Sequence, residues 1–227
     1  MILFYFCCMT ETTHHDNSDK EKKSGSSSFE IGKSRIESFS DGVIAIIITL
    51  MILNVKVPDI TGEMSGGNVW KELVLAFPQL AAYVLSFILL GVYWVNHHHF
   101  FHALRTTDRN LLWWNLNLLF WLSLIPLPTY FMAQHPFRAE ATALYGFHVL
   151  AASVSFIQMG RYARLKNLMH HNLSGRRRRR LTLMNRLSMA LYIVSIFAGY
   201  VSVYISYTIF IVVPAMYFLP QKIVIED

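Results

Sequence analysis

The sequence predicts an all-α integral membrane protein with six transmembrane helices in each chain. Three observations predict this fold class: the composition, the length of the apolar segments, and the distribution of basic residues between those segments. Of the 227 residues, 54% are hydrophobic and only 15% are charged. This balance is typical of a chain that places much of its surface in lipid, and it disfavours a water-soluble domain.

Six apolar segments are candidate membrane spans, because a helix needs about 20 apolar residues to cross about 30 Å of hydrocarbon. They cover residues 39–57, 70–95, 111–133, 139–160, 183–198 and 200–219. The last two segments form one stretch that is too long for a single span. Gly199 lies between them and predicts a tight helical hairpin.

The distribution of Lys and Arg predicts the orientation, because cytoplasmic connections carry the excess of basic residues. If both termini are cytoplasmic, the inner segments hold 17 of the 20 basic residues, and the outer ends hold only Lys56, Lys71 and Arg138. An odd number of spans would place a basic segment on the wrong side. We therefore expect a multi-pass protein with both termini in the cytoplasm.

The chain divides into three parts. Residues 1–34 are expected to form a disordered cytoplasmic tail, because residues 16–28 are polar and rich in Ser and Lys. Residues 35–220 form the six-helix transmembrane domain, and residues 221–227 form a short cytoplasmic C-terminal tail. The only cysteines, Cys7 and Cys8, are adjacent and could pair only with strain, so no disulfide framework is expected.

The first span contains the most informative polar residue, Asp41. An ionised Asp within a membrane helix costs about 2.5 to 3.5 kcal/mol, so it normally faces a partner or water inside the bundle. At about 100° per residue, Asp41 lies about 120° from the direction of Arg35. A stripe within about 60° of Arg35 contains Phe39, Gly42, Ile46, Thr49, Leu50 and Leu53. Spacing alone favours a helix-packing role for this stripe, with Gly42 at the close contact.

The motif Arg35-x-x-x-Phe39-Ser40-Asp41, followed by an apolar run to Thr49 and Leu50, resembles the signature of the transmembrane-protein-175 family. This family comprises potassium channels of animal endolysosomes and their prokaryotic relatives. Further segments resemble family features and extend the resemblance over residues 35–220: Trp94-Val-Asn96-His97-His98, 112–117, Pro126-Leu-Pro128-Thr129 and Ala143-Leu-Tyr145-Gly146.

The resemblance implies a potassium-selective, leak-type cation channel whose pore is lined by the first helix of each chain. A bulky apolar residue five positions after the signature Asp forms the constriction in the family, and Ile46 holds that position here. Thr49, Leu50 and Leu53 continue the same face. The sequence has no Thr-Val-Gly-Tyr-Gly-like filter, which agrees with a hydrophobic constriction.

One signature per chain implies that the pore forms by oligomerisation, because one pore-lining helix cannot close a pore. Family members with two repeats resemble a fused pair, so a single-repeat chain is expected to form a homotetramer with cyclic symmetry. The single repeat also favours a prokaryotic plasma membrane. Potassium ions are the permeant species, and no cofactor is expected.

The resemblance further implies a hydrogen-bonded network near the cytoplasmic side. The signature residues are Arg35, Phe39, Ser40 and Asp41, and charge-assisted bonds from this group would fix the tilt of the pore helix. The candidate partners are His97, His98, Asp108 and Asn115. Which histidine pairs with Asp41 stays open.

The cluster of His97, His98 and His99 with His102 has a spacing that allows two imidazoles to share a metal. We favour hydrogen-bonding and interfacial roles and expect no metal, because no cysteine lies near and histidine is common at wet boundaries. The basic run Arg176 to Arg180 is expected to contact anionic lipid headgroups rather than nucleic acid, because it lies between two membrane spans.

Two other function classes are a transporter and an intramembrane enzyme. A proton-coupled secondary transporter would use Asp41 and the His97–His99 cluster, but the sequence has no paired inverted repeat, and Pro126 and Pro128 interrupt only one helix. An intramembrane enzyme would need a second carboxylate or a nucleophile with its base at matching depth. Asp41 is the only acidic residue well within a predicted span, so no enzyme is expected.

Overall fold

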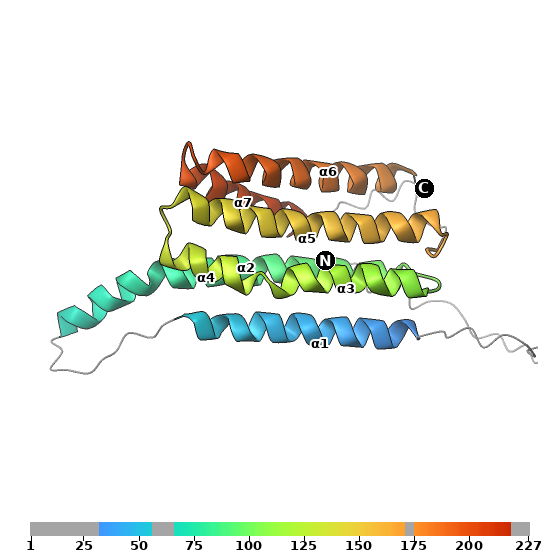
Figure 1. Cartoon of the computed structure of the whole chain (residues 1–227), viewed down its shortest axis with the longest axis horizontal. Helices are drawn as coiled ribbons and strands as arrows, with labels where there is room; N and C mark the ends of the chain where they lie inside the picture. Colours follow the sequence, from blue (N-terminus) through green and yellow to red (C-terminus); the bar gives the residue numbers. More distant parts are fainter. Residues whose placement is uncertain (1–31, 56–65, 171–174, 219–227) are drawn as a thin grey trace, which may run out of the picture.

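The computed structural model describes residues 32–55, 66–170 and 175–218, which form a bundle of helices with no strand of its own (Figure 1). The elements are α1 (Lys33–Met51), the short 3₁₀ helix η2 (Ile52–Asn54), α2 (Gly66–His102), α3 (Arg109–Ser123), α4 (Pro126–Gln134), α5 (Ala139–Leu165), α6 (Gly175–Ala198) and α7 (Val203–Phe218). The all-α prediction is confirmed. Cys7, Cys8 and most of both predicted tails lie outside the described residues.

The observed helices overlap the predicted spans, but their ends differ. α1 covers Lys33–Met51 where residues 39–57 were expected, and residues 56 and 57 lie outside the described part of the chain. α2 runs seven residues past the predicted end at residue 95, and α6 begins at Gly175, so the basic run forms its first turns rather than a loop. A helix satisfies its backbone hydrogen bonds internally, so it continues into water when no breaker residue follows. Among the described residues, three helical segments are long and apolar enough to cross a membrane: Ala76–His102, Arg109–Gln134 and Ala139–Leu165. The apolar helices Thr182–Ala198 and Val203–Tyr217 are shorter.

The third span contains a break between α3 and α4, at Leu124 and Ile125. Pro126 contributes to this break, because its nitrogen carries no proton for the hydrogen bond that would continue the α-helix to the Leu122 carbonyl. The N–H of Ile125 bonds to the carbonyl of Leu122 at 3.1 Å, so a tighter turn joins the two helices. The Ile125 carbonyl accepts from both the backbone N–H and the hydroxyl of Thr129, at 3.1 and 2.7 Å.

The predicted hairpin at Gly199 is confirmed. α6 ends at Ala198, a turn follows, and α7 begins at Val203. A Cβ atom at position 199 would clash with the Thr142 hydroxyl and would lie 3.3 Å from the Ser206 hydroxyl. Glycine is needed here because the turn lies directly against the first turn of α5.

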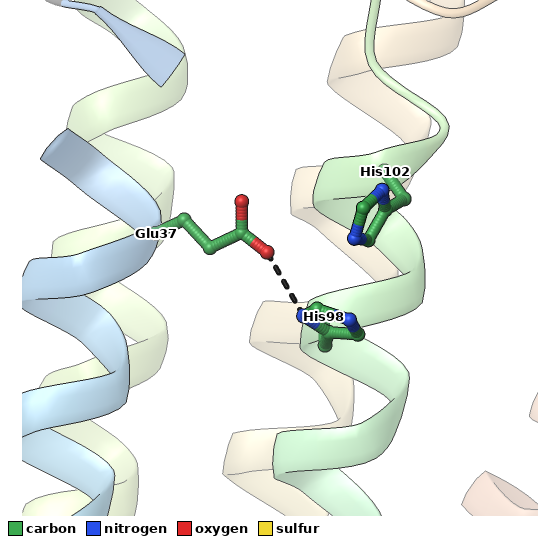
Figure 2. A group of neighbouring side chains, drawn as sticks. All are labelled: Glu37, His98 and His102. Carbon is green, nitrogen blue, oxygen red and sulfur yellow. Dashed lines mark ion pairs between the residues drawn. The ribbon is translucent and has the colours of Figure 1, made fainter. Parts of the chain in front are cut away.

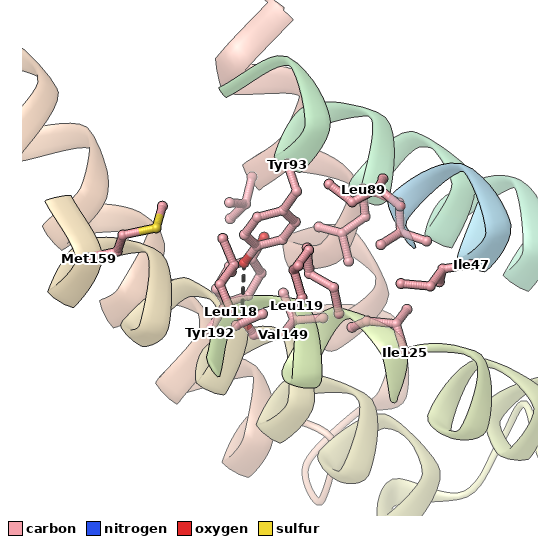
Figure 3. Packing of buried hydrophobic residues seen from close by; sticks show 14 of the residues in the cluster. Ile47, Leu89, Tyr93, Leu118, Leu119, Ile125, Val149, Met159 and Tyr192 are labelled. Atoms are coloured by element: carbon pink, nitrogen blue, oxygen red, sulfur yellow. Dashed lines mark hydrogen bonds between the residues drawn. The ribbon is translucent and has the colours of Figure 1, made fainter. Parts of the chain in front are cut away.

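The helices form layers, with α1 at one edge and α6 at the other (Figure 1). α1 packs against α2 and α3, and α5 packs against both α3 and α6. Buried side chains from α2, α3, α5 and α6 meet in the interior, among them Tyr93, Leu118, Val149 and Tyr192 (Figure 3). α1 therefore has one side inside the bundle and one side open.

The start of α1 and two connections lie at one end of the bundle. The backbone of Arg105 donates to Leu168 at 2.8 Å, and that of His170 donates to Ala103 at 3.0 Å, so the α2–α3 and α5–α6 connections are joined. The Lys33 ammonium donates to the Leu104 carbonyl at 3.0 Å. These segments carry basic residues that the sequence predicts on the cytoplasmic side of the membrane.

Candidate functional site

α1 presents the predicted stripe as an open face of the single chain. All its members are exposed: Arg35, Phe39, Gly42, Ile46, Thr49, Leu50 and Leu53. Ile46 is 58% exposed and Leu53 is 75% exposed, which is high for large apolar side chains. A Cβ atom added to Gly42 would meet nothing within 4 Å. This stripe is therefore available to lipid, to another copy of the chain or to a pore.

The opposite side of α1 is buried at the spacing expected for one helix face: Ile36, Ser40, Ile44, Ile47 and Met51. Four of these side chains are apolar and pack into the hydrophobic core. Ser40 is fully buried and donates its hydroxyl proton to the Ile36 carbonyl at 2.8 Å. The burial of this face fixes the direction in which the stripe points.

A buried chain of hydrogen bonds joins α1, α3 and α2. The Asn115 amide nitrogen donates to the Ser40 hydroxyl at 2.9 Å, and the Asn115 amide oxygen lies 2.8 Å from His97 Nε2. Since the amide oxygen can only accept, His97 carries its proton on Nε2 in this arrangement. All three residues are at most 1% exposed. The structure thus brings together three of the predicted network residues.

Asp41 has a partner that the sequence did not single out. The Trp94 indole N–H donates to its carboxylate at 2.9 Å, so α2 supplies an aromatic donor where a histidine was expected. The two predicted histidines have other partners: His97 bonds to Asn115, and His98 pairs with Glu37. Trp94 begins the segment Trp94-Val-Asn96-His97-His98 in the resemblance, which is the signal that could have identified it.

Glu37 is a second residue that the sequence analysis missed. Its carboxylate lies 2.9 Å from His98 Nδ1, and it projects from α1 toward His98 and His102 of α2 (Figure 2). Glu37 precedes Asp41 by four residues, so the two carboxylates lie on the same side of α1. This four-residue spacing is visible in the sequence and could have identified Glu37.

Asp108 belongs to a different cluster from the one predicted. Its side chain caps α3 by accepting from the Leu111 backbone N–H at 2.8 Å, and its other oxygen accepts from the Tyr162 hydroxyl at 2.6 Å. Asp108 therefore links α3 to α5, and neither of these bonds involves Asp41. Arg35 and Phe39 lie on the open stripe of α1, away from the buried hydrogen bonds.

Thr49 is the one hydroxyl residue on the open stripe. It lies within 3.0 Å of both the Ala45 and Ile46 carbonyls and donates its proton back to its own helix. With the proton directed to the backbone, the lone pairs of the hydroxyl oxygen face outward from the helix. This arrangement can coordinate a cation.

Comparison with known proteins finds the same family as the signature does. The family model described as "Endosomal/lysosomal potassium channel TMEM175" matches residues 35–126. A protein named "Potassium channel" from Chryseobacterium sp. (strain P1-3) is 32% identical over 198 residues, which cover 84% of this chain and 94% of that protein. Another of the same description, from Chamaesiphon minutus, is 33% identical over 188 residues, covering 81% and 92% of the two chains.

The fold agrees with a solved structure. The crystal structure of a lysosomal potassium-selective channel TMEM175 homolog from Chamaesiphon minutus superposes with a TM-score of 0.69 and 29% sequence identity. The match covers 82% of this chain and 96% of that one. Because these relatives are covered almost completely and are channels rather than enzymes, the chain is an integral membrane protein that belongs to the TMEM175 channel family.

Proposed function

We propose that this chain is a potassium-selective, leak-type cation channel that works as a homotetramer. The observation that carries the proposal is the open apolar stripe of α1 around Ile46, opposite a face that is buried and hydrogen-bonded. Potassium selectivity is supported by the names of the two bacterial relatives and by the solved homolog.

Oligomerisation follows from the position of α1. It lies at the edge of the bundle, so copies arranged around an axis would bring their α1 helices together (Figure 1). A closed cyclic assembly places the same face of every copy toward that axis. The number four rests on the resemblance, in which members with two repeats resemble a fused pair.

The side chains on the stripe have complementary roles in this proposal. A ring of Ile46 side chains forms a narrow apolar constriction, which can close by losing its water. A ring of Thr49 hydroxyls offers oxygen lone pairs that replace part of the hydration shell of potassium. Leu50 and Leu53 continue the apolar wall, so the pore needs no loop of carbonyl oxygens.

The buried contacts of α1 would hold the pore geometry. The Ser40, Asn115 and His97 chain fixes α1 against α3 and α2, and the bond from Trp94 to Asp41 adds a second attachment. Hydrogen bonds that involve an ionised group are stronger than neutral ones. These residues therefore position the pore helix without contacting the ion.

We place the channel in a plasma membrane with both termini cytoplasmic. The basic connections and the start of α1 share one end of the bundle, as the distribution of Lys and Arg requires. The first turns of α6 carry the basic run, which would bind anionic lipid headgroups at that surface. No nucleic acid partner and no cofactor are part of the proposal.

Planar-bilayer recording tests the function directly. Purified protein is placed between potassium on one side and sodium on the other, and the reversal potential of single openings is measured. Discrete openings that reverse toward the potassium equilibrium value support the proposal. Saturable, proton-driven flux without unitary current, in protein shown to be folded and oligomeric, would instead favour a transporter built on Asp41 and the His97–His99 cluster.

A further inference from the structure

We propose that Glu37, His98 and His102 form a binding site for a divalent transition metal, with Zn²⁺ as the best fit. One ligand atom of each residue lies within 4.8 Å of the others. The three side chains converge from two helices, Glu37 from α1 and the two histidines from α2 (Figure 2). The inference does not depend on the channel function.

The ligand chemistry favours zinc. Zn²⁺ binds imidazole nitrogen at about 2.0–2.1 Å and carboxylate oxygen at about 2.0–2.2 Å, usually with tetrahedral geometry. Those bond lengths place neighbouring ligand atoms about 3.3 Å apart. Glu37 and His98 are already 2.9 Å apart, and the spread within the whole group is close enough for small side-chain rotations to reach this geometry.

The backbone already places the ligands. His98 and His102 are four residues apart on α2, so they lie on the same face, and their ring centroids are 4.4 Å apart. Glu37 faces them from α1, which runs alongside. Two imidazoles at this spacing with a carboxylate from a second element are a frequent ligand set for zinc, and a fourth position stays open for water.

The site is accessible from water. It lies at the end of the bundle where α1 begins and α2 ends, and His102 is exposed. The side chains of His98 and Glu37 retain 38% and 18% of their accessible surface. Lys33 lies one turn before Glu37 on the same side of α1, and it directs its ammonium to the Leu104 carbonyl. Metal could therefore reach the three ligands without opening the bundle.

The simpler explanation is an ion pair between Glu37 and a protonated His98. That pair needs neither His102 nor a metal, so His102 separates the two explanations. The histidines of α2 alone would offer a metal few ligands, with no cysteine near them. The carboxylate of Glu37 supplies the third ligand, and this ligand comes from another helix. A metal held there would join α1 to α2.

Isothermal titration calorimetry of the full chain with Zn²⁺ tests the site. The purified protein carries no histidine tag, and bound metal is first removed with a chelator. We expect one tight Zn²⁺ site per chain, a higher melting temperature with Zn²⁺, and no comparable binding of Mg²⁺. His102→Gln and Glu37→Gln should each weaken the tight site by at least tenfold. His170→Gln changes another exposed histidine and serves as the matched control.

Two separate variants test the site, so poor folding of one of them leaves the other to decide the result. Exposed His102 can be changed with little risk to folding, and size-exclusion profiles and melting temperatures measured in chelator identify any unfolded variant. Unchanged Zn²⁺ affinity in folded His102→Gln would overturn the proposal and leave only the ion pair. Absence of a tight site in the wild-type chain would overturn it as well.

Discussion

At the scale of single residues, Ile46 is the side chain whose role can be tested most directly. It is large, apolar and exposed on α1, at the position where the family resemblance implies the constriction. Ile46→Asn should raise unitary conductance and weaken potassium selectivity, because an amide keeps water in a narrow segment that isoleucine would dry. Single-channel recording measures both quantities. Ile52→Asn, at an exposed isoleucine beyond the end of α1, is the control. Unchanged currents in Ile46→Asn would remove this residue from the pore.

The role of the Thr49 hydroxyl can be tested with two substitutions, one that keeps the shape of the side chain and one that keeps the hydroxyl. Valine has nearly the shape of threonine but lacks the oxygen, whereas serine keeps the hydroxyl. We expect Thr49→Val to move the reversal potential between potassium and sodium solutions toward zero, and Thr49→Ser to preserve most of it. Equal selectivity in both variants would show that the hydroxyl does not contact the ion.

Asp41 should matter more for assembly than for permeation, because its carboxylate is engaged by Trp94 instead of pointing along the open stripe. Removing a hydrogen bond to a charged group costs about 1.5–3 kcal/mol. Asp41→Ala is therefore expected to lower the melting temperature and the oligomer yield, and Asp41→Asn, which keeps an acceptor, to do so less. A normally assembled Asp41→Ala protein without current would contradict this assignment.

At the scale of elements, the sequence predicts the helices better than their contacts. The apolar segments, the break near Pro126 and the hairpin at Gly199 follow from local properties, namely hydrophobicity, the missing proline N–H and the small size of glycine. The extensions of α2 and α6 could not be found from hydropathy, because polar residues continue a helix as well as apolar ones do. Helix ends therefore depart from the predicted membrane boundaries.

The side-chain contacts between helices could not be predicted from such local properties. The stripe and the buried face of α1 follow from helical periodicity, which is local. The partners of Asp41 and Glu37 depend on the register of α2 against α1, and a shift by one turn would exchange Trp94 for His98. Asp108 is the N-cap of α3, so its side chain bonds within its own helix, a contact that the family resemblance does not indicate.

The close approach of α5 and α6 gives a prediction about packing. A Cβ atom at Gly146 would lie 2.9 Å from the Ser195 hydroxyl and 3.2 Å from Ile196 Cγ1. Gly146→Ala should destabilise the protein by about 1–3 kcal/mol through overpacking. Gly91→Ala is the matched control, because a Cβ there meets nothing within 4 Å and alanine favours a helix. Thermal unfolding in detergent compares the two; equal melting temperatures would show that α5 and α6 separate at little cost.

At the scale of the whole molecule, the single chain is complete as a bundle but not as a pore. One face of α1 packs into the core with the other helices, whereas its opposite face leaves an exposed apolar stripe at one edge. A channel assembled from four chains would bring the four Ile46 side chains to a common axis. Exposed apolar residues of α6, at the opposite edge of the bundle, would lie away from that axis (Figure 1).

The assembly can be tested by placing a cysteine on α1 or on α6. In a background with Cys7→Ser and Cys8→Ser, Ile46→Cys should make the current sensitive to block by Cd²⁺, because thiolates that converge on an axis can share one soft metal ion. Ile193→Cys, at an exposed position on α6, should leave the current insensitive. Native mass spectrometry should give a species of four chains of 26.2 kDa each. Cd²⁺ block of both variants alike, or a dimer as the largest species, would contradict a tetrameric pore lined by α1.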